Sequence, residues 1–145
     1  MKRLDFYFII LGLLISVAST AYANNYTFTT IDVPGATNNW GAAGINDSGT
    51  IVGTYDNATE NGRIFLYSGG SFTTIDVHHA WANGINNSGS IVGLYTDGSN
   101  WPHNFLYAGG NLTTIDVPWA TSNWGAKGIN DSGSIVGSYG DAPYY

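Results

Sequence analysis

The sequence predicts an all-β protein built from repeated four-stranded antiparallel sheets, as in the blades of a β-propeller. The pentapeptide Thr-Thr-Ile-Asp-Val occurs three times, at 29–33, 73–77 and 113–117. The hexapeptide Gly-Ile-Asn-(Asp/Asn)-Ser-Gly also occurs three times, at 44–49, 84–89 and 128–133, and runs each time into Ile-Val-Gly-x-Tyr. Repeats of about 40 residues that hold four short strands are typical of propeller blades. The repeats contain no apolar pattern at helical spacing, which argues against a helical bundle.

Four strands are expected in each repeat, and the first repeat shows their order. The first strand is centred on 44–46, and the second, at 50–55, is rich in β-branched and aromatic residues. A polar loop at 56–62 leads to a continuous apolar third strand at 64–67, which predicts burial on both faces. The fourth strand, at 72–77, alternates side chains between the two faces of the sheet.

Two sets of repeated glycines have different expected roles. Gly49, Gly89 and Gly133 close the turn between the first two strands, where a positive φ is needed. The second set lies in the middle of the second strand, where a glycine normally weakens a sheet. We expect a neighbouring backbone or an aromatic ring to pass close to these positions, which are Gly53, Gly93 and Gly137.

The repeats predict a single domain over 24–145 that does not close into a ring. An orphan fourth strand at 24–33 precedes units at 40–77 and 81–117 and an incomplete unit at 124–145, which gives eleven strands or about 2.75 blades. Closed propellers typically have four to eight blades. A partial or open propeller is therefore predicted, with a β-solenoid or an open stack of sheets as alternatives. Open sheet edges also predict that the chain is either a fragment of a longer repeat protein or one part of an oligomer that associates through these edges.

The N-terminal segment 1–23 has the features of a cleaved signal peptide. Lys2 and Arg3 precede an apolar run at 6–18, and Ala21-Tyr22-Ala23 provides the small residues that a signal peptidase recognises. Thirteen apolar residues are too few to cross the roughly 30 Å core of a bilayer. The protein is therefore predicted to be exported to the periplasm or the outside of the cell, with no membrane attachment after cleavage.

Charge and cysteine content restrict the partners and the stabilising bonds of the exported chain. Residues 24–145 contain two cations, Arg63 and Lys127, against nine acidic residues, which gives a formal net charge of −7. That charge repels phosphate backbones, so nucleic acid is not expected as a partner. The chain has no cysteine, so the exported protein must rely on packing rather than on disulfides.

The combined motifs resemble the HAF family of probable extracellular repeats, which are exported bacterial proteins. The resemblance runs from Tyr26 onward and rests on the Gly-Ile-Asn motif, Phe-Leu-Tyr at 65–67 and 105–107, and Thr-Thr-Ile-Asp-Val. The His-Ala-Phe tripeptide of the family corresponds here to 63–65 and 103–105, which read Arg-Ile-Phe and His-Asn-Phe. The resemblance implies export and a repeated β architecture, and it implies no particular activity.

Tryptophan supplies the candidate ligand-binding residues. Trp40, Trp81 and Trp124 recur just before Gly-Ile-Asn, where flat rings could line a rim and stack on sugars. Packing between repeats is the alternative and is favoured, because tryptophan is usually well buried. Trp101 and Trp119 lie outside this pattern.

Acidic and histidine residues give weaker candidates. Asp32, Asp76 and Asp116 recur at the end of the fourth strand, where hydrogen bonds to nearby backbone N–H groups are a better explanation than a cation site or glycoside chemistry. His78 and His79 lack an identifiable third metal ligand. Neither a metal nor another cofactor is predicted.

Two classes of function are consistent with this pattern. The first is an exported binding or structural scaffold for polysaccharide or a protein partner. The second is a secreted hydrolase or lyase that acts on glycans. The first is favoured because no nucleophile elbow, phosphate loop or zinc motif is present, and because near-identical repeats differ from the asymmetric cluster that catalysis needs.

Overall fold

The computed structural model describes residues 26–141. The predicted signal peptide at 1–23 lies outside these residues. The chain divides into one unit that ends at Thr30 and a second that begins at Ile31. Residues 26–30 of the first unit form no strand, and all ten strands of the described chain belong to the second. Within 26–141 there is no helix with the length and hydrophobicity to span a bilayer.

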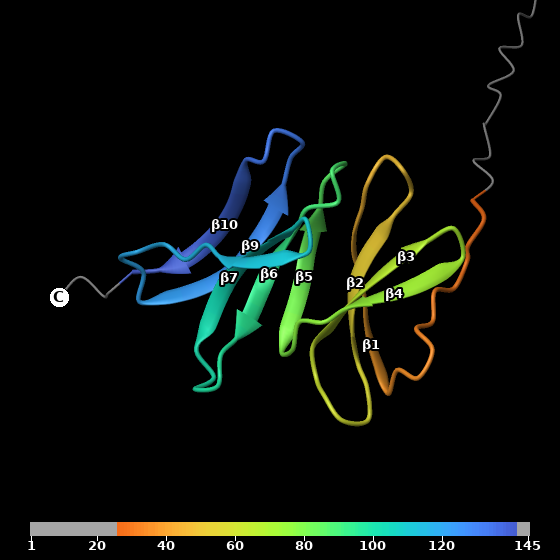
Figure 1. Ribbon diagram of the computed structural model, residues 1–145, viewed down its shortest axis with the longest axis horizontal. Helices are drawn as coiled ribbons and strands as arrows, with labels where there is room; N and C mark the ends of the chain where they lie inside the picture. The colour runs from red at the N-terminus through yellow and green to blue at the C-terminus, as the bar shows by residue number, and fades with distance from the viewer. Residues whose placement is uncertain (1–25, 142–145) are drawn as a thin grey trace, which may run out of the picture. The chain divides into compact units, whose positions relative to one another are not determined.

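The strands form three antiparallel sheets that follow one another in chain order (Figure 1). The first sheet has the order β1-β2-β3-β4, the second has the order β5-β6-β7-β8, and the third contains β9 and β10. None of the three closes on itself, which confirms the predicted all-β fold of open four-stranded units. The strands are β1 (Asn38–Ile45), β2 (Ile51–Asp56), β3 (Arg63–Ser68), β4 (Ser71–Ile75), β5 (Ala80–Ile85), β6 (Ile91–Thr96), β7 (Pro102–Ala108), β8 (Asn111–Thr114), β9 (Ser122–Ile129) and β10 (Ile135–Gly140).

The structure corrects two of the predicted elements. The first strand of the first sheet begins at Asn38, well before the predicted centre near Gly44, because two bulges let it keep its pairing with β2. The predicted orphan strand is absent, since residues 26–33 form no strand and the described chain has ten strands rather than eleven. The fourth strands of the two complete sheets, β4 and β8, each pair only with a third strand, β3 or β7. In the described chain no third strand precedes β1, so residues 26–33 have no strand to pair with.

The repeated turn between the first two strands of each sheet is held by its asparagine. In the first repeat, Oδ1 of Asn46 accepts hydrogen bonds from the backbone N–H of Thr50 at 2.9 Å and from the hydroxyl of Ser48 at 2.7 Å. Gly49 ends the turn with φ of 79°. The same bonds recur around Asn86 and Asn130, so one local sequence produces one turn three times.

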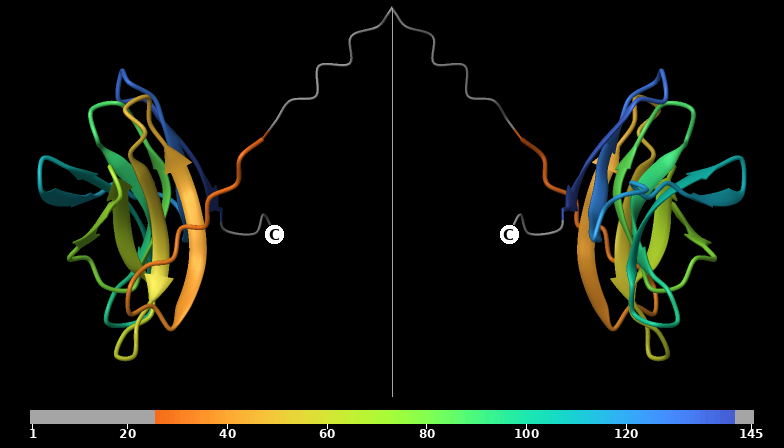
Figure 2. Two further views of the ribbon diagram at one scale, coloured as in Figure 1. Left: turned by 90° about the vertical axis from the view of Figure 1, so that its right-hand side faces the viewer. Right: turned by 90° about the vertical axis from the view of Figure 1, so that its left-hand side faces the viewer.

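The equivalent turns of the three sheets are joined by hydrogen bonds from repeat to repeat. The side-chain amide of Asn46 donates to the backbone oxygen of Asn86 at 3.3 Å, and that of Asn86 donates to the backbone oxygen of Asn130 at 3.1 Å. The three turns lie at the same end of the sheets (Figure 2). We call this set of turns the asparagine ladder.

Apolar side chains fill the space between the first two sheets. Phe105 from β7 is fully buried there against Ile64 and Ile75 of the first sheet and Ile91 of the second. A second cluster covers the opposite face of the first sheet, where Val33 packs with its neighbours Tyr55 and Phe65. Residues 31–33 thus cover this face although they form no strand.

The mid-strand glycines are crowded, as expected, by a neighbouring backbone and, at Gly53 and Gly93, by an aromatic ring; these contacts lie inside each sheet. A Cβ on Gly93 would lie 2.1 Å from the backbone oxygen of Trp81 and 2.8 Å from the Phe105 ring, both in the same sheet. A Cβ on Gly53 would likewise meet the backbone oxygen of Gly41 and the ring of Phe65. In both sheets a backbone oxygen of the first strand, close to a bulge, lies against the glycine of the second strand, so a side chain has no room there.

Candidate functional site

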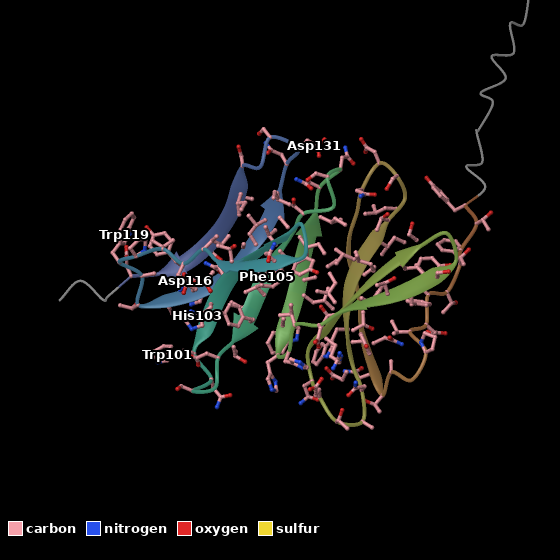
Figure 3. The ribbon with its side chains drawn as sticks, viewed as in Figure 1. Trp101, His103, Phe105, Asp116, Trp119 and Asp131 are labelled. Carbon is pink, nitrogen blue, oxygen red and sulfur yellow. The ribbon has the colours of Figure 1, made fainter. Side chains whose placement is uncertain are left out.

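An open cleft of about 360 Å³ lies beside β7, between the β6–β7 loop and the linker from β8 to β9. Trp101, His103, Asp116, Pro118 and Asn123 are among the residues that line it. Figure 3 labels Trp101, His103, Asp116 and Trp119 in this part of the chain. We call this region the tryptophan cleft.

The β6–β7 loop presents Trp101 to solvent. Oδ1 of Asp97 accepts hydrogen bonds from the backbone N–H groups of Ser99 at 2.8 Å and Trp101 at 2.9 Å. The backbone N–H of Asp97 donates in turn to the backbone oxygen of Trp101 at 3.0 Å. Aspartate favours this kind of turn because its carboxylate replaces backbone partners. The loop is therefore closed on itself, and the Trp101 side chain remains 58% exposed.

The β8–β9 linker presents a second exposed ring, that of Trp119. The backbone N–H of Ala120 donates to the backbone oxygen of Val117 at 3.0 Å, which makes a turn with Pro118 and Trp119 at its centre. Thr121 then anchors the linker, since its backbone N–H and its hydroxyl both donate to the backbone oxygen of Gly140. Trp119 is 70% exposed and lies between two residues that line the cleft.

The floor of the tryptophan cleft contains a histidine between two carboxylates. Nδ1 of His103 lies 2.5 Å from Oδ2 of Asp116, and Nε2 lies 3.4 Å from Oδ2 of Asp97. The other oxygen of Asp116 accepts a hydrogen bond from the backbone N–H of Asn104 at 2.7 Å. The imidazole also stacks on the ring of Tyr95, with 5.1 Å between the ring centroids. These contacts fix both the position and the orientation of His103.

These contacts change the ionisation of the cleft. The hydrogen bond to Asp116 raises the pKa of His103, burial opposes this shift, and the contact with Asp97 adds to it. Backbone hydrogen bonds from Trp101 and Ser99 lower the pKa of Asp97. His103 therefore carries a positive charge over a wider pH range than a free histidine, and this charge offsets part of the acidic surroundings.

The first repeat has a different cluster at the equivalent place. Arg63 occupies the position of His103 and pairs with Glu60, and its guanidinium lies 3.7 Å from Asp76. His78 bridges the same two acids, at 2.8 Å from Glu60 and 3.1 Å from Asp76. Both repeats therefore pair a basic residue at the start of the third strand with the repeated aspartate, and only the second repeat adds an exposed tryptophan in the preceding loop.

The predicted tryptophans do not form a common site. Trp40 and Trp124 are exposed, so the favoured expectation of packing between repeats is wrong for these two, whereas Trp81 is partly buried. Trp124 lies against Gly140 of its own sheet. Trp40 lies in β1, next to Asn39 and Gly41, which pair with Tyr55 and Thr54 of β2 in the same sheet. Within 26–141, no pair of these three rings stacks.

The repeated aspartates have three different environments. Asp116 accepts the backbone hydrogen bond that the sequence predicts, at a strand junction. The carboxylate of Asp76 is 84% exposed and contacts only the side chains of Arg63 and His78 among the described residues. Asp32 is exposed, and no partner for its carboxylate lies in 26–141. The expected role in fixing the backbone therefore applies to Asp116 alone.

Sequence reasoning missed the tryptophan cleft because its two exposed tryptophans fall outside the repeats. Trp101 and Trp119 occur once each, and a search for recurring positions passes over them. A usable signal was present, since both tryptophans stand next to a proline in a loop and both loops lead to His103 or Asp116.

Within 26–141, no three histidine or acidic side chains are arranged to hold a metal ion.

Comparison with known proteins gives no match to a protein family, to a curated protein or to a solved structure. The resemblance to HAF repeats therefore stays a prediction from the motifs.

Proposed function

We propose that the protein is an exported binding scaffold that holds neutral polysaccharide in the tryptophan cleft. The observation that carries this proposal is the pair of exposed tryptophans, Trp101 and Trp119, on the two loops that border a cleft with a polar floor. Export and HAF-type repeats are part of the proposal and rest on the sequence alone.

The chemistry of the cleft suits a sugar chain. The apolar faces of sugar rings stack on flat aromatic side chains, and tryptophan offers the largest such surface. The carboxylate of Asp116 supplies acceptors and the side-chain nitrogen of Asn123 supplies donors for sugar hydroxyls. An open cleft suits a polymer, because a chain longer than the cleft can extend into solvent.

Charge favours a neutral polymer over an anionic one. The segment after the predicted signal has a formal net charge of −7. The one basic side chain at the floor, His103, is already paired with Asp116 and Asp97. A polyanion would therefore be repelled without gaining a free cation in the cleft.

The hydrolase or lyase alternative has less support from this site. Glycoside hydrolysis uses two carboxyl groups that act on the scissile bond. Here Asp97 accepts two backbone hydrogen bonds, and Asp116 accepts one and contacts His103. Both carboxylates thus have structural partners.

A glycan array with the purified protein, followed by titration calorimetry on the sugars that bind, tests the proposal. Trp101→Ala and Trp119→Ala should each weaken binding roughly three- to tenfold, because each removes one stacking surface. Trp40→Ala is the matched control, since it removes an equally exposed tryptophan outside the cleft.

Two results would contradict this function. The first is an equal loss of affinity in the Trp40 control, and the second is full affinity in a Trp101→Ala/Trp119→Ala double variant. A glycosidase and lyase assay on the same sugars tests the alternative, and turnover that disappears in Asp116→Asn would favour it.

A further inference from the structure

A second cavity, of about 370 Å³, lies beside β10 on the side that faces the second sheet. Ile115 and Val117 from the end of the second repeat form one wall, and Ile135, Gly137 and Tyr139 of β10 form the other. Its lining is mainly apolar. It is distinct from the tryptophan cleft, although Val117 contributes to both.

The same place is filled by a phenylalanine ring in the other two sheets. Gly53 of β2 pairs with Phe65 of β3, and Gly93 of β6 pairs with Phe105 of β7. A Cβ on either glycine would come within 3 Å of that ring. At Gly137 of β10 the nearest atoms belong to Gly125 and Ala126, and no aromatic ring is close to it among residues 26–141.

The residues around the cavity are the counterparts of those around Phe105. In the core between the first two sheets, Phe105 packs with Ile75, Val77 and Ile91. One repeat later, the equivalent positions are Ile115, Val117 and Ile135, and all three line the cavity. The cavity is therefore a preformed socket for the phenylalanine of a third strand, and we call it the phenylalanine socket.

The edge of the third sheet is open where such a strand would pair. Within 26–141, β10 is hydrogen-bonded to β9 alone, whereas β2 and β6 are each paired on both sides. Tyr139 of β10 is 40% exposed, against 6% for its counterpart Tyr55. An unpaired strand edge presents free N–H and C=O groups that can pair with another extended chain.

A buried polar atom in the wall of the socket also lacks a partner. Asn104 lines the cavity and is buried, and its amide nitrogen donates to Oδ1 of Asn123 at 3.0 Å. Its own Oδ1 accepts no hydrogen bond from the described chain. A buried acceptor without a donor is unfavourable, so an occupant that brings an N–H or O–H group would satisfy it.

We propose that the edge of β10 binds an extended peptide as an added third strand. The peptide contains the sequence Phe-Leu-Tyr or a close equivalent, and its phenylalanine occupies the socket. The two filled sheets define this occupant, since Phe-Leu-Tyr is what pairs with Ile-Val-Gly in both. Backbone hydrogen bonds to the edge provide affinity, and the socket selects the aromatic residue. This site is independent of the proposed binding of polysaccharide.

A synthetic peptide with the sequence of β7, Pro-His-Asn-Phe-Leu-Tyr-Ala, tests the inference by fluorescence anisotropy with the purified protein. We expect saturable binding with one peptide for each chain. Replacement of the phenylalanine in the peptide by alanine should weaken binding at least tenfold, because a buried aromatic side chain is lost from the socket. Equal affinity of the two peptides would overturn the proposal.

Backbone pairing is tested with two further peptides, which are N-methylated at one or the other alternating set of residues. Alternate residues of a strand direct their N–H groups to opposite sides, so only one set can bond to β10. Binding should be abolished by methylation of one set and kept with the other. Binding that both sets retain would overturn the proposal, because it would show that no strand is added.

The protein is tested with Gly137→Val, which places a side chain in the socket and should abolish binding of the peptide. The peptide variants above leave the fold of the protein untouched, so they decide the question if this variant is unstable. Sedimentation of the protein with and without peptide provides the last outcome. If the protein sediments as a dimer, and excess peptide neither binds to it nor dissociates it, a second copy occupies the edge. That result would overturn the proposal.

Discussion

The side-chain amide of Asn87 donates a hydrogen bond of 2.7 Å to Oδ2 of Asp47, which lies one repeat earlier in the chain. The same nitrogen donates at 2.8 Å to Oδ2 of Asp131, one repeat later. Two further bonds run along the same line, from the backbone N–H of Asp47 to Asn87 and from the backbone N–H of Asn87 to Asp131. A neutral asparagine therefore joins two acids across three turns.

This arrangement explains the one variable position in the repeated turn. The fourth residue of Gly-Ile-Asn-(Asp/Asn)-Ser-Gly is acidic in the first and third repeats and neutral in the second. Three acids in contact would repel one another and would leave the carboxylates without donors. The alternation of charge along the asparagine ladder gives every carboxylate a donor and separates the like charges.

Asn87→Asp should destabilise the fold by about 1–2 kcal/mol, because two side-chain hydrogen bonds are lost and three carboxylates become neighbours. Thermal unfolding followed by circular dichroism measures the change. Added salt should restore part of the loss, since the positions are exposed. Asn61→Asp adds the same charge at an exposed site outside the ladder and serves as the control. An equal effect of the two changes would mean that the ladder contributes nothing.

Gly93→Ala should also destabilise the fold, by about 1–3 kcal/mol, as is typical of overpacking. The added Cβ would lie 2.1 Å from a backbone oxygen, which cannot move without breaking the pairing of β5 with β6. Gly98→Ala is the matched control, because a Cβ there meets no atom within 4 Å. The difference between the two melting temperatures is the measurement. Similar melting temperatures would show that the backbone of β5 moves to accommodate the added Cβ without loss of stability.

Most of the fold could be predicted because each repeat encodes its own turns and strands. The turn around Asn46 is fixed by side-chain bonds within five residues, so the local sequence is sufficient. The start of β1 was not predictable in this way. Its pairing from Asn38 onward depends on two bulges, which are set by contact with β2 and leave no clear alternation in the sequence.

The candidate sites were less predictable, because they arise where the repeats differ. The tryptophan cleft combines two loops, and the rings of Trp101 and Trp119 have no counterparts in the first repeat. Trp40 and Trp124 are exposed and Trp81 is partly buried although the three occupy equivalent repeat positions, a difference that no periodic pattern reveals. The pairing of His103 with Asp116 spans 13 residues and two strands, so it required the register of β7 and β8.

That pairing predicts how the cleft responds to pH. The pKa of His103 is higher in the folded chain than its ordinary value of about 6.5, mainly because of the hydrogen bond to Asp116. A raised pKa means that the charged imidazole stabilises the fold fully below pH 6.5, and that this contribution is lost as the pH rises through the folded pKa. The stability difference between the wild type and His103→Gln should therefore shrink as the pH increases above 6.5.

The titration of the His103 ring by NMR measures this shift directly, and Asp116→Asn tests its cause. Asparagine keeps an oxygen for the backbone N–H of Asn104 but removes the charge beside the imidazole, so the pKa of His103 should fall toward 6.5. Asp32→Asn removes the same charge from an exposed repeat position and should leave the titration unchanged. A pKa of His103 that stays raised in Asp116→Asn would show that Asp116 does not cause the shift, and would remove the electrostatic basis for the charged floor of the tryptophan cleft.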